Sequence, residues 1–235
     1  MQWAEQMRYD TTMESLAEQD ERLSRGGLGR RRVDVVLRGL DLAIAAFGLV
    51  LLSPALVLVA AAILLTSGSP LFYRGLRVGR HGRVFDMYKF RTLEPDAESR
   101  LGPYYGEELS RRTEAEVTSL GRLLRTAQLD EIPQLWNVLH GDMSMVGPRP
   151  IRPTFFEQLA HEIPQYWQRL VVRPGLSGFA QTRMGREEAW AEKLAHDLEY
   201  IADRSVGLYL RVVAATIWRL FKQSGVAVLG RSLRR

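Results

Sequence analysis

The chain has 235 residues, a formal net charge of +5 and no cysteine. The lack of cysteine excludes disulfides, thiolate zinc sites and a thiol nucleophile. Its four histidines are scattered without a metal-binding spacing, and the positive charge favours a polyanionic partner such as anionic lipid, a phosphorylated substrate or nucleic acid.

The first 32 residues are polar and run from an acidic stretch to a basic stretch that contains several glycines. Such a composition buries too little apolar surface to order itself. We therefore predict a flexible N-terminal arm over residues 1–32, with a helical piece around Thr12–Leu23.

Residues 42–66 form a run of 25 residues without a charge. A helix of that length spans about 37 Å, more than the roughly 30 Å hydrocarbon layer of a bilayer. The run is longer than a signal-peptide core or a typical buried helix. We therefore predict a membrane helix within residues 33–69.

Two features favour a re-entrant helix, which returns to the side it entered, over the alternative of a full span. Pro54 lies near the middle of the run, where its ring and missing N–H bend a helix, and Ser53 can satisfy a carbonyl freed there. Arginines flank the run on both sides and favour the cytoplasmic face. These arginines are Arg30, Arg31, Arg32 and Arg38 before it, and Arg74, Arg77, Arg80 and Arg83 after it.

The remaining pattern predicts a compact catalytic domain over residues 70–223 that is mostly α with a small β element. Val84–Phe90 reads as a strand after a glycine turn, and residues 94–117 read as a loop with helical pieces. Helices are predicted over residues 118–139 in two parts, 155–170, 187–203 and 205–223. The last is basic and amphipathic and contains Trp218, which suits a membrane interface or packing on the core; residues 224–235 form a C-terminal tail.

Asp130 and Glu131 precede Pro133, which fits the first turn of a helix. The residue before a proline is disfavoured as helical, so the two carboxylates should lie just ahead of that helix. The free N–H groups there would keep a carboxylate ionised and attract phosphate. Adjacent carboxylates at such a position suit a Mg²⁺–phosphate site, and a simple helix cap is the alternative.

Basic residues surround this pair in the sequence. Lys89 and Arg91 end the predicted strand, and Arg122 and Arg125 precede the pair. Two rigid turns, Gly147-Pro148-Arg149-Pro150 and Arg173-Pro174-Gly175, each present one arginine. Proline and glycine fix the backbone, so each guanidinium could bind phosphate in a defined geometry, although each turn taken singly could be structural.

From Arg38 to about Phe221 the sequence resembles the bacterial sugar transferase family, the monotopic phosphoglycosyl transferases, in their small catalytic form. The matching stretches are Arg38-x-x-Asp41, Ser53-Pro54, Arg77-Val78-Gly79, Lys89 to Leu93, Leu129 to Val138, Gly141 to Pro150, Arg173 to Gln181, and Asp197-x-x-Tyr200. The sequence departs from the family pattern at Ala127-Gln128, Gly75 and Leu208-Tyr209-Leu210.

The resemblance implies transfer of a sugar 1-phosphate from a UDP-sugar to a polyprenyl phosphate, with release of UMP and Mg²⁺ as cofactor. By the same resemblance Asp130 would be the nucleophile and Glu131 its partner at the metal. The substrate-binding residues would be Lys89, Arg91, Arg122, Arg125, Arg149, Arg173 and Gln181. The implied location is the bacterial cytoplasmic membrane, with the catalytic domain on the cytoplasmic face.

The rival interpretation is a membrane-tethered protein that binds anions, or a scaffold, without catalysis. It explains the charge and the apolar run, but not two adjacent carboxylates among arginine turns. Few aromatic residues accompany the basic stretches, so we expect no nucleic-acid partner. A homo-oligomer remains open.

Overall fold

The computed structural model describes residues 31–97, 100, 106–183 and 189–232, so nearly all of the predicted N-terminal arm lies outside the described residues. The described chain is mostly helical with two small two-stranded sheets, as predicted. Its elements are α2 (Val33–Ser67), β1 (Phe72–Val78), η1 (Arg80–Gly82), β2 (Val84–Phe90), α4 (Gly106–Ala115), α5 (Ser119–Thr126), η2 (Leu129–Glu131), α6 (Gln134–His140), β3 (Ser144–Val146), α7 (Pro153–Glu162), η3 (Tyr166–Val171), β4 (Gly175–Ser177), α8 (Phe179–Arg183), α9 (Trp190–Asp203) and α10 (Val206–Ser232).

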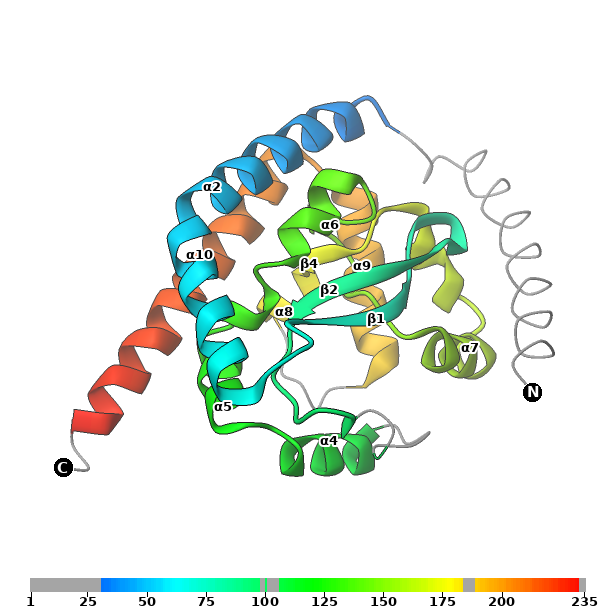
Figure 1. Cartoon of the computed structure of the whole chain (residues 1–235). Coiled ribbons are helices and arrows are strands. Elements are labelled where there is room, and N and C mark those ends of the chain that lie inside the picture. The colour runs from blue at the N-terminus through cyan, green and yellow to red at the C-terminus, as the bar shows by residue number, and fades with distance from the viewer. Residues whose placement is uncertain (1–30, 98–99, 101–105, 184–188, 233–235) are drawn as a thin grey trace.

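Helix α2 curves along one side of the molecule, and its direction changes midway (Figure 1). Pro54 lies inside it, and a proline leaves the carbonyl four residues back without its usual N–H partner. That carbonyl belongs to Val50, and the Ser53 hydroxyl donates to it at 2.8 Å. The predicted local compensation by Ser53 is therefore confirmed. Among the described helices only α2 is long and apolar enough to cross a membrane, by length and composition.

The hairpin β1–β2 is antiparallel and pairs Phe72 with Phe90 and Val78 with Val84, so the predicted strand has a partner just before it in the chain. The middle of β2 packs against α6 through Asn137, which is fully buried. The amide of Asn137 accepts from the Tyr88 N–H at 3.0 Å and donates to the Asp86 carbonyl at 2.7 Å. These two hydrogen bonds fix the position of β2 along α6.

The second sheet is small but brings two distant turns together. Strands β3 and β4 are parallel, and beyond them the Gly147 N–H donates to the Ser177 carbonyl and the Gly175 N–H donates to the Pro148 carbonyl, both at 2.9 Å. A Cβ on Gly147 or Gly175 would collide with the backbone of the other turn. Glycine is required at both positions because the two backbones touch.

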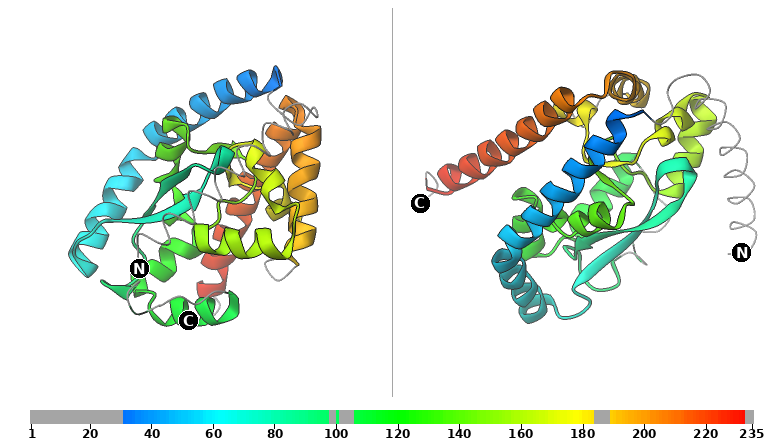
Figure 2. Two further views of the ribbon diagram at one scale, coloured as in Figure 1. Left: turned by 90° about the vertical axis from the view of Figure 1, so that its right-hand side faces the viewer. Right: turned by 90° about the horizontal axis from the view of Figure 1, so that it is seen from above.

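Helix α6 lies between α2 and the hairpin, while α10 runs beside α2 and α9 packs behind the sheets (Figures 1 and 2). One core cluster joins α2, β2 and α6 through buried apolar residues. These residues are Ala45, Met87, Leu135, Val138 and Met143. The long apolar helix α2 and the hairpin thus share one core through α6.

Two predicted helix boundaries differ from the structure. The helix predicted over residues 155–170 ends at Glu162, and a 3₁₀ helix follows from Tyr166. Pro164 explains the break because it disfavours a helical residue before it and lacks an N–H. The last helix, predicted to end at residue 223, continues to Ser232. The two-part helix over residues 118–139 is confirmed as α5, η2 and α6.

Candidate active site

A pocket of about 1010 Å³ opens between the hairpin, α4, α5 and the η2 turn. Its walls are strongly charged, with more basic than acidic side chains. The basic residues are Arg74, Arg77, Lys89, Arg91, Arg122, Arg125, Arg149 and Arg152, and the acidic residues are Glu94, Asp96, Glu114, Asp130 and Glu131. Such a wall suits an anionic ligand that carries several phosphate oxygens.

Asp130 and Glu131 lie in the 3₁₀ turn η2, just before α6, as the sequence predicts. The chain enters this turn through Gln128, whose backbone is left-handed with φ 55°. Asp130 is buried, with 7 % of its surface exposed, whereas Glu131 is half-buried. The tight turn therefore gives two neighbouring carboxylates different environments.

Burial raises the pKa of Asp130, and the neighbouring charge of Glu131 raises it further. Lys89 and Arg125 act in the opposite direction because their positive charges favour the ionised carboxylate. Desolvation is the largest influence on this pKa, and the backbone N–H of Asp130 itself joins the two cations in opposing it. That this carboxylate stays ionised remains a prediction.

Glu131 forms an ion pair with Lys89, whose Nζ donates to Oε1 at 2.6 Å. Lys89 is next in β2 to Tyr88, which Asn137 of α6 holds, so the strand register places the ammonium group beside the turn. Arg125 approaches from α5, where its Nε donates to the Thr92 hydroxyl at 2.9 Å. Two separate elements, β2 and α5, thus bring cations to one pair of carboxylates.

Arg149 lines the pocket from the turn that follows β3. A buried arginine that was not predicted supports this turn: Arg169 donates from Nη2 to the Arg149 carbonyl at 2.8 Å. The same Nη2 lies 2.8 Å from Asp197, and both side chains of this ion pair are almost fully buried. The sequence signal was Asp197 in the Asp-x-x-Tyr stretch, but its arginine partner could not be found from spacing.

Sequence reasoning missed further cations of the pocket, notably Arg77 and Arg152. Burial lowers the pKa of Arg77, and the nearby charges of Arg152 and Arg149 lower it as well. An arginine still remains charged, so this crowding stores repulsion that an anion would relieve. The available signal was Arg77 in its matching stretch and the closeness of Arg152 to Arg149 in the chain.

Arg91 reaches the pocket but uses its guanidinium to hold the end of α2. It donates to the carbonyls of Pro70, Ser67 and Gly68 at 2.6–2.7 Å. A cation at a helix C-terminus satisfies carbonyls that lack helical partners. Its Nη1 is buried and has no hydrogen-bond partner in the part of the chain that the structure describes. Arg91 therefore contributes to the attachment of α2 as well as to the pocket wall.

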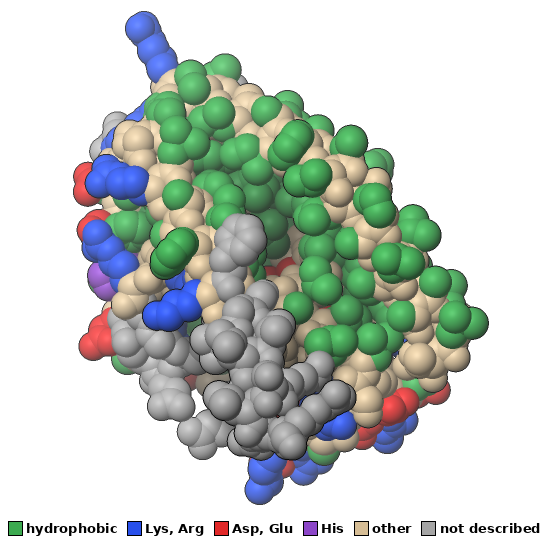
Figure 3. All heavy atoms as spheres, turned by 90° about the vertical axis from the view of Figure 1, so that its left-hand side faces the viewer, with side chains coloured by type: hydrophobic (Ala, Val, Ile, Leu, Met, Phe, Trp, Pro, Cys, Tyr) green, Lys and Arg blue, Asp and Glu red, His purple; other side chains and the backbone are tan. Residues whose placement is uncertain are grey.

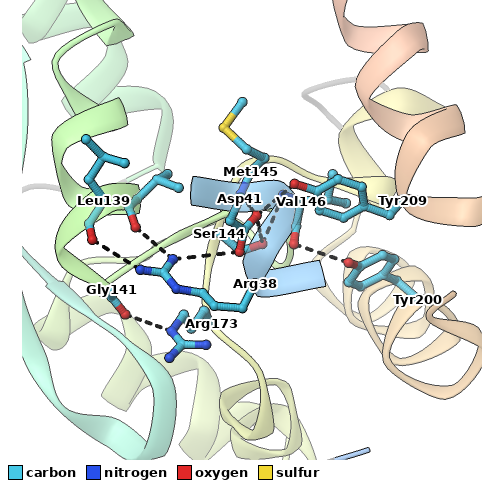
Figure 4. A network of polar contacts seen from close by, with 11 residues as sticks. Arg38, Asp41, Leu139, Gly141, Ser144, Met145, Val146, Arg173, Tyr200 and Tyr209 are labelled. Carbon is cyan, nitrogen blue, oxygen red and sulfur yellow. Dashed lines mark hydrogen bonds and ion pairs between the residues drawn. The ribbon is translucent and has the colours of Figure 1, made fainter. Parts of the chain in front are cut away.

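Two predicted substrate-binding residues do not line the pocket. The Gln181 amide accepts from the Gly178 N–H at 3.0 Å, which is a local bond at the start of α8. Arg173 donates to the Gly141 carbonyl at 2.8 Å, on the side of the sheet that faces α2 (Figure 4). The sequence placed Arg173 in a rigid turn correctly, but the direction of that turn depends on the parallel pairing of β3 with β4.

The network around Arg173 attaches α2 to the domain (Figure 4). Asp41, which is 2 % exposed, accepts from the Ser144 hydroxyl, the Met145 N–H and the Tyr209 hydroxyl at 2.8–2.9 Å. Arg38 donates to the carbonyls of Val138 and Leu139 at the end of α6. The early Arg38-x-x-Asp41 stretch is thus a clamp between α2, α6, β3 and α10.

The sequence that forms the pocket, the apolar helix and the clamp matches a known family over most of the chain. The model of the bacterial sugar transferase family matches residues 32–223. The chain therefore belongs to the bacterial sugar transferase family, a family of enzymes.

Three characterised relatives illustrate the match. The chain is 40 % identical over 197 residues to the UDP-glucose:undecaprenyl-phosphate glucose-1-phosphate transferase of Caulobacter vibrioides, covering 82 % of this chain and 72 % of the relative. It is 38 % identical over 154 residues to the UDP-N-acetylgalactosamine-undecaprenyl-phosphate N-acetylgalactosaminephosphotransferase of Aeromonas hydrophila, covering 64 % and 35 %. It is 31 % identical over 168 residues to the undecaprenyl-phosphate galactose phosphotransferase of Salmonella typhimurium, covering 67 % of this chain and 35 % of the relative. The chain thus spans about a third of the length of two of these relatives.

Proposed function

We propose that this protein transfers a sugar 1-phosphate from a UDP-sugar to a polyprenyl phosphate and releases UMP. One observation carries the proposal: a buried carboxylate, Asp130, lies in a pocket rich in cations, beside the Lys89–Glu131 ion pair. The substrate class comes from the relatives, whose names include UDP-sugars and undecaprenyl phosphate.

The reaction proceeds in two steps. A carboxylate oxygen of Asp130 attacks the β-phosphorus of the donor, the bond from that phosphorus to the bridging oxygen breaks, and UMP leaves with the electron pair. A phosphate oxygen of the polyprenyl acceptor then attacks the same phosphorus, and the bond to Asp130 breaks to restore the carboxylate. Lys89, Arg125 and Arg149 offset the charge that builds up on the phosphoryl oxygens.

The two carboxylates fit a Mg²⁺ ion. No group of three metal-binding side chains occurs among the described residues. Mg²⁺ needs no such group, because it commonly takes one or two carboxylates together with substrate phosphates and water. Asp130 and Glu131 would hold the ion, which would neutralise charge on the donor's diphosphate.

The apolar surface of α2 and α10 supports the proposal that the enzyme is membrane-bound and that α2 is re-entrant. Hydrophobic side chains gather along α2 and α10 and line the hollow between them (Figure 3). Exposed members include Phe47, Val50, Leu51, Val57, Leu58, Leu65, Ile217 and Trp218. We infer that this face enters the bilayer and that α10 lies at the interface.

Both ends of α2 bind the same domain, and this is the argument for a helix that returns. Near its start, Asp34 pairs with Arg204 at 2.7 Å and Asp41 bonds to β3 and α10. Near its end, Ile63 packs against Phe90 and Leu124. A helix that crossed the bilayer would carry its two ends to opposite sides. The domain would then lie on one face, the cytoplasmic face of the bacterial inner membrane.

Single cysteines test this topology cleanly, because the chain has none of its own. Cysteines at Arg32 and Ser69, which are exposed just outside the two ends of α2, should both react with an impermeant thiol reagent only from the cytoplasmic side. Labelling of one position from the outside would establish a full span.

The two-step reaction is tested by omitting the acceptor. Purified protein mixed with UDP-sugar and Mg²⁺ should release about one UMP per active site in a rapid burst, because the donor step needs no acceptor. Intact-mass analysis should show a sugar-phosphate adduct on the peptide that contains Asp130. Normal steady-state turnover without a burst would instead mean direct transfer.

A further inference from the structure

A smaller cavity of about 190 Å³ adjoins the active-site pocket. The two share their charged wall, made by Arg77, Lys89, Glu131, Arg149 and Arg152, so the cavity is a side chamber of the pocket. The rest of its wall carries no charge. These uncharged residues are Met87, Gln134, Pro150, Ile151, Phe155, Gly175, Leu176 and Trp190. The chamber therefore has a cationic mouth and a mainly apolar end.

Two aromatic rings from different helices meet in this chamber wall. Phe155 in the first turn of α7 and Trp190 at the start of α9 pack edge to face, with ring centroids 5.1 Å apart. Both side chains are only half-buried. The Lys193 ammonium lies over the Trp190 ring, 4.7 Å from its centroid, so a base would stack on the ring surface that Lys193 leaves open. A partly exposed aromatic pair beside cations is a stacking surface for a planar ring attached to phosphate.

Gln134 supplies the polar group of the chamber. Its side chain is 3 % exposed, and its amide nitrogen has no hydrogen-bond partner among the described residues. A buried amide without a partner is unfavourable, so such a group in a cavity wall marks a place for a ligand acceptor. A small rotation of the amide toward the chamber would let it donate to a ring carbonyl.

We propose that this side chamber binds the uracil base of the donor nucleotide, an inference that rests on the proposed use of a UDP-sugar. The base lies against Trp190 and Phe155, with a ring carbonyl facing Gln134. The diphosphate then crosses the cationic mouth, formed by Arg77, Arg149 and Lys89, toward Asp130. A chamber of about 190 Å³ has room for one base, and the Gln134 amide favours uracil over adenine because adenine has no ring carbonyl to accept its hydrogen bond.

Calorimetric titration of the detergent-solubilised full chain with UDP and ADP tests the chamber. The wild type should bind UDP more tightly than ADP. Trp190→Ala should weaken UDP binding about tenfold or more, because that is the range for loss of one base–aromatic stack, and should leave ADP binding nearly unchanged. Trp190→Phe should retain most of the UDP affinity, since it keeps a ring. Trp218→Ala, which removes an exposed tryptophan from α10, is the matched control and should bind UDP as the wild type does.

Three results would overturn the proposal. Equal affinity of the wild type for UDP and ADP would exclude recognition of the uracil ring in this chamber. An equal loss of both nucleotides in Trp190→Ala would mean that the ring only supports the fold around the cations. Unchanged UDP binding with weaker UDP-glucose binding would assign the chamber to the sugar.

Two further outcomes separate a failure of the chamber from a failure of the proposed transfer reaction. If UDP binding depends on Trp190 but no UMP is released from any UDP-sugar, the chamber stands and the transfer reaction fails. If UMP release is normal but UDP binding is indifferent to Trp190, the reaction stands and the chamber fails.

Discussion

Two buried aspartates show how one fold can use the same side chain in opposite ways. Asp41 and Asp130 are 2 % and 7 % exposed, so both lose most of their contact with water. Asp41 accepts three hydrogen bonds from β3 and α10. Asp130 accepts none from another described residue and faces a pocket with cations nearby. The first carboxylate is satisfied by its own protein, whereas the second is left for a ligand.

The comparison teaches that burial alone does not identify a catalytic carboxylate. A buried charge needs partners, and the fold supplies them at Asp41 from the chain itself. At Asp130 the fold supplies nearby cations and its own backbone N–H but no donor from another described residue, and burial raises the pKa of this carboxyl. We therefore expect mutations at the two positions to divide cleanly between stability and activity.

The largest expected effect is on catalysis at Asp130. Asp130→Asn removes the attacking carboxylate oxygen and should reduce UMP release and sugar-phosphate transfer by about 10³-fold or more. Its fold should persist, because the side chain supports no neighbouring residue. Activity assays and a thermal unfolding curve on the same preparation check both halves. Near-normal turnover would remove Asp130 from the role of nucleophile.

The next effect is on stability at Asp41. Asp41→Ala leaves the Met145 N–H and the hydroxyls of Ser144 and Tyr209 without their acceptor, so the free energy of unfolding should fall by about 3–5 kcal/mol. Denaturant unfolding in detergent measures this loss. The exposed neighbour Leu42→Ala is a control that should change little. An unchanged unfolding curve for Asp41→Ala would contradict the clamp.

A smaller loss is expected when one donor is removed from the same clamp. Tyr209→Phe keeps the packing of a buried ring but removes the hydroxyl that bonds to Asp41 at 2.8 Å. The carboxylate keeps two other donors, so the free energy of unfolding should fall by about 2 kcal/mol. A loss as large as that of Asp41→Ala would mean that the three bonds act as one unit.

The smallest expected effect is a dependence of stability on pH at Asp130. Its pKa is raised in the folded chain, so the native state holds this proton more tightly than the unfolded state. Stability from the protonated form is present below the ordinary pKa of aspartate and is lost as pH rises through the raised value. Asp130→Asn should therefore unfold at a slightly higher temperature than the wild type at neutral pH. That gap should close in acid; a gap that widens in acid would contradict the raised pKa.

Local features of this protein follow from the sequence. The apolar run predicts α2, Pro54 predicts its bend, and Ser53 satisfies the Val50 carbonyl as expected. Asp130 and Glu131 lie ahead of α6 as expected, and Pro133 is the N-cap of that helix, although Ile132 before the proline has a helical backbone with φ −56° and ψ −38°. These outcomes depend on a few neighbouring residues, whose backbone limits and hydrogen-bonding groups act over one or two turns of chain.

The tertiary structure decides the contacts between distant segments. Arg173 and Arg149 come from similar rigid turns, yet only Arg149 lines the pocket, because the pairing of β3 with β4 turns Arg173 toward Gly141. Asp41 accepts a hydrogen bond from Tyr209, 168 residues later in the chain. Phe155 contacts Trp190 only because α7 and α9 pack together. Sequence spacing does not predict such contacts. They depend on how whole elements pack and on which buried polar groups require a hydrogen-bond partner.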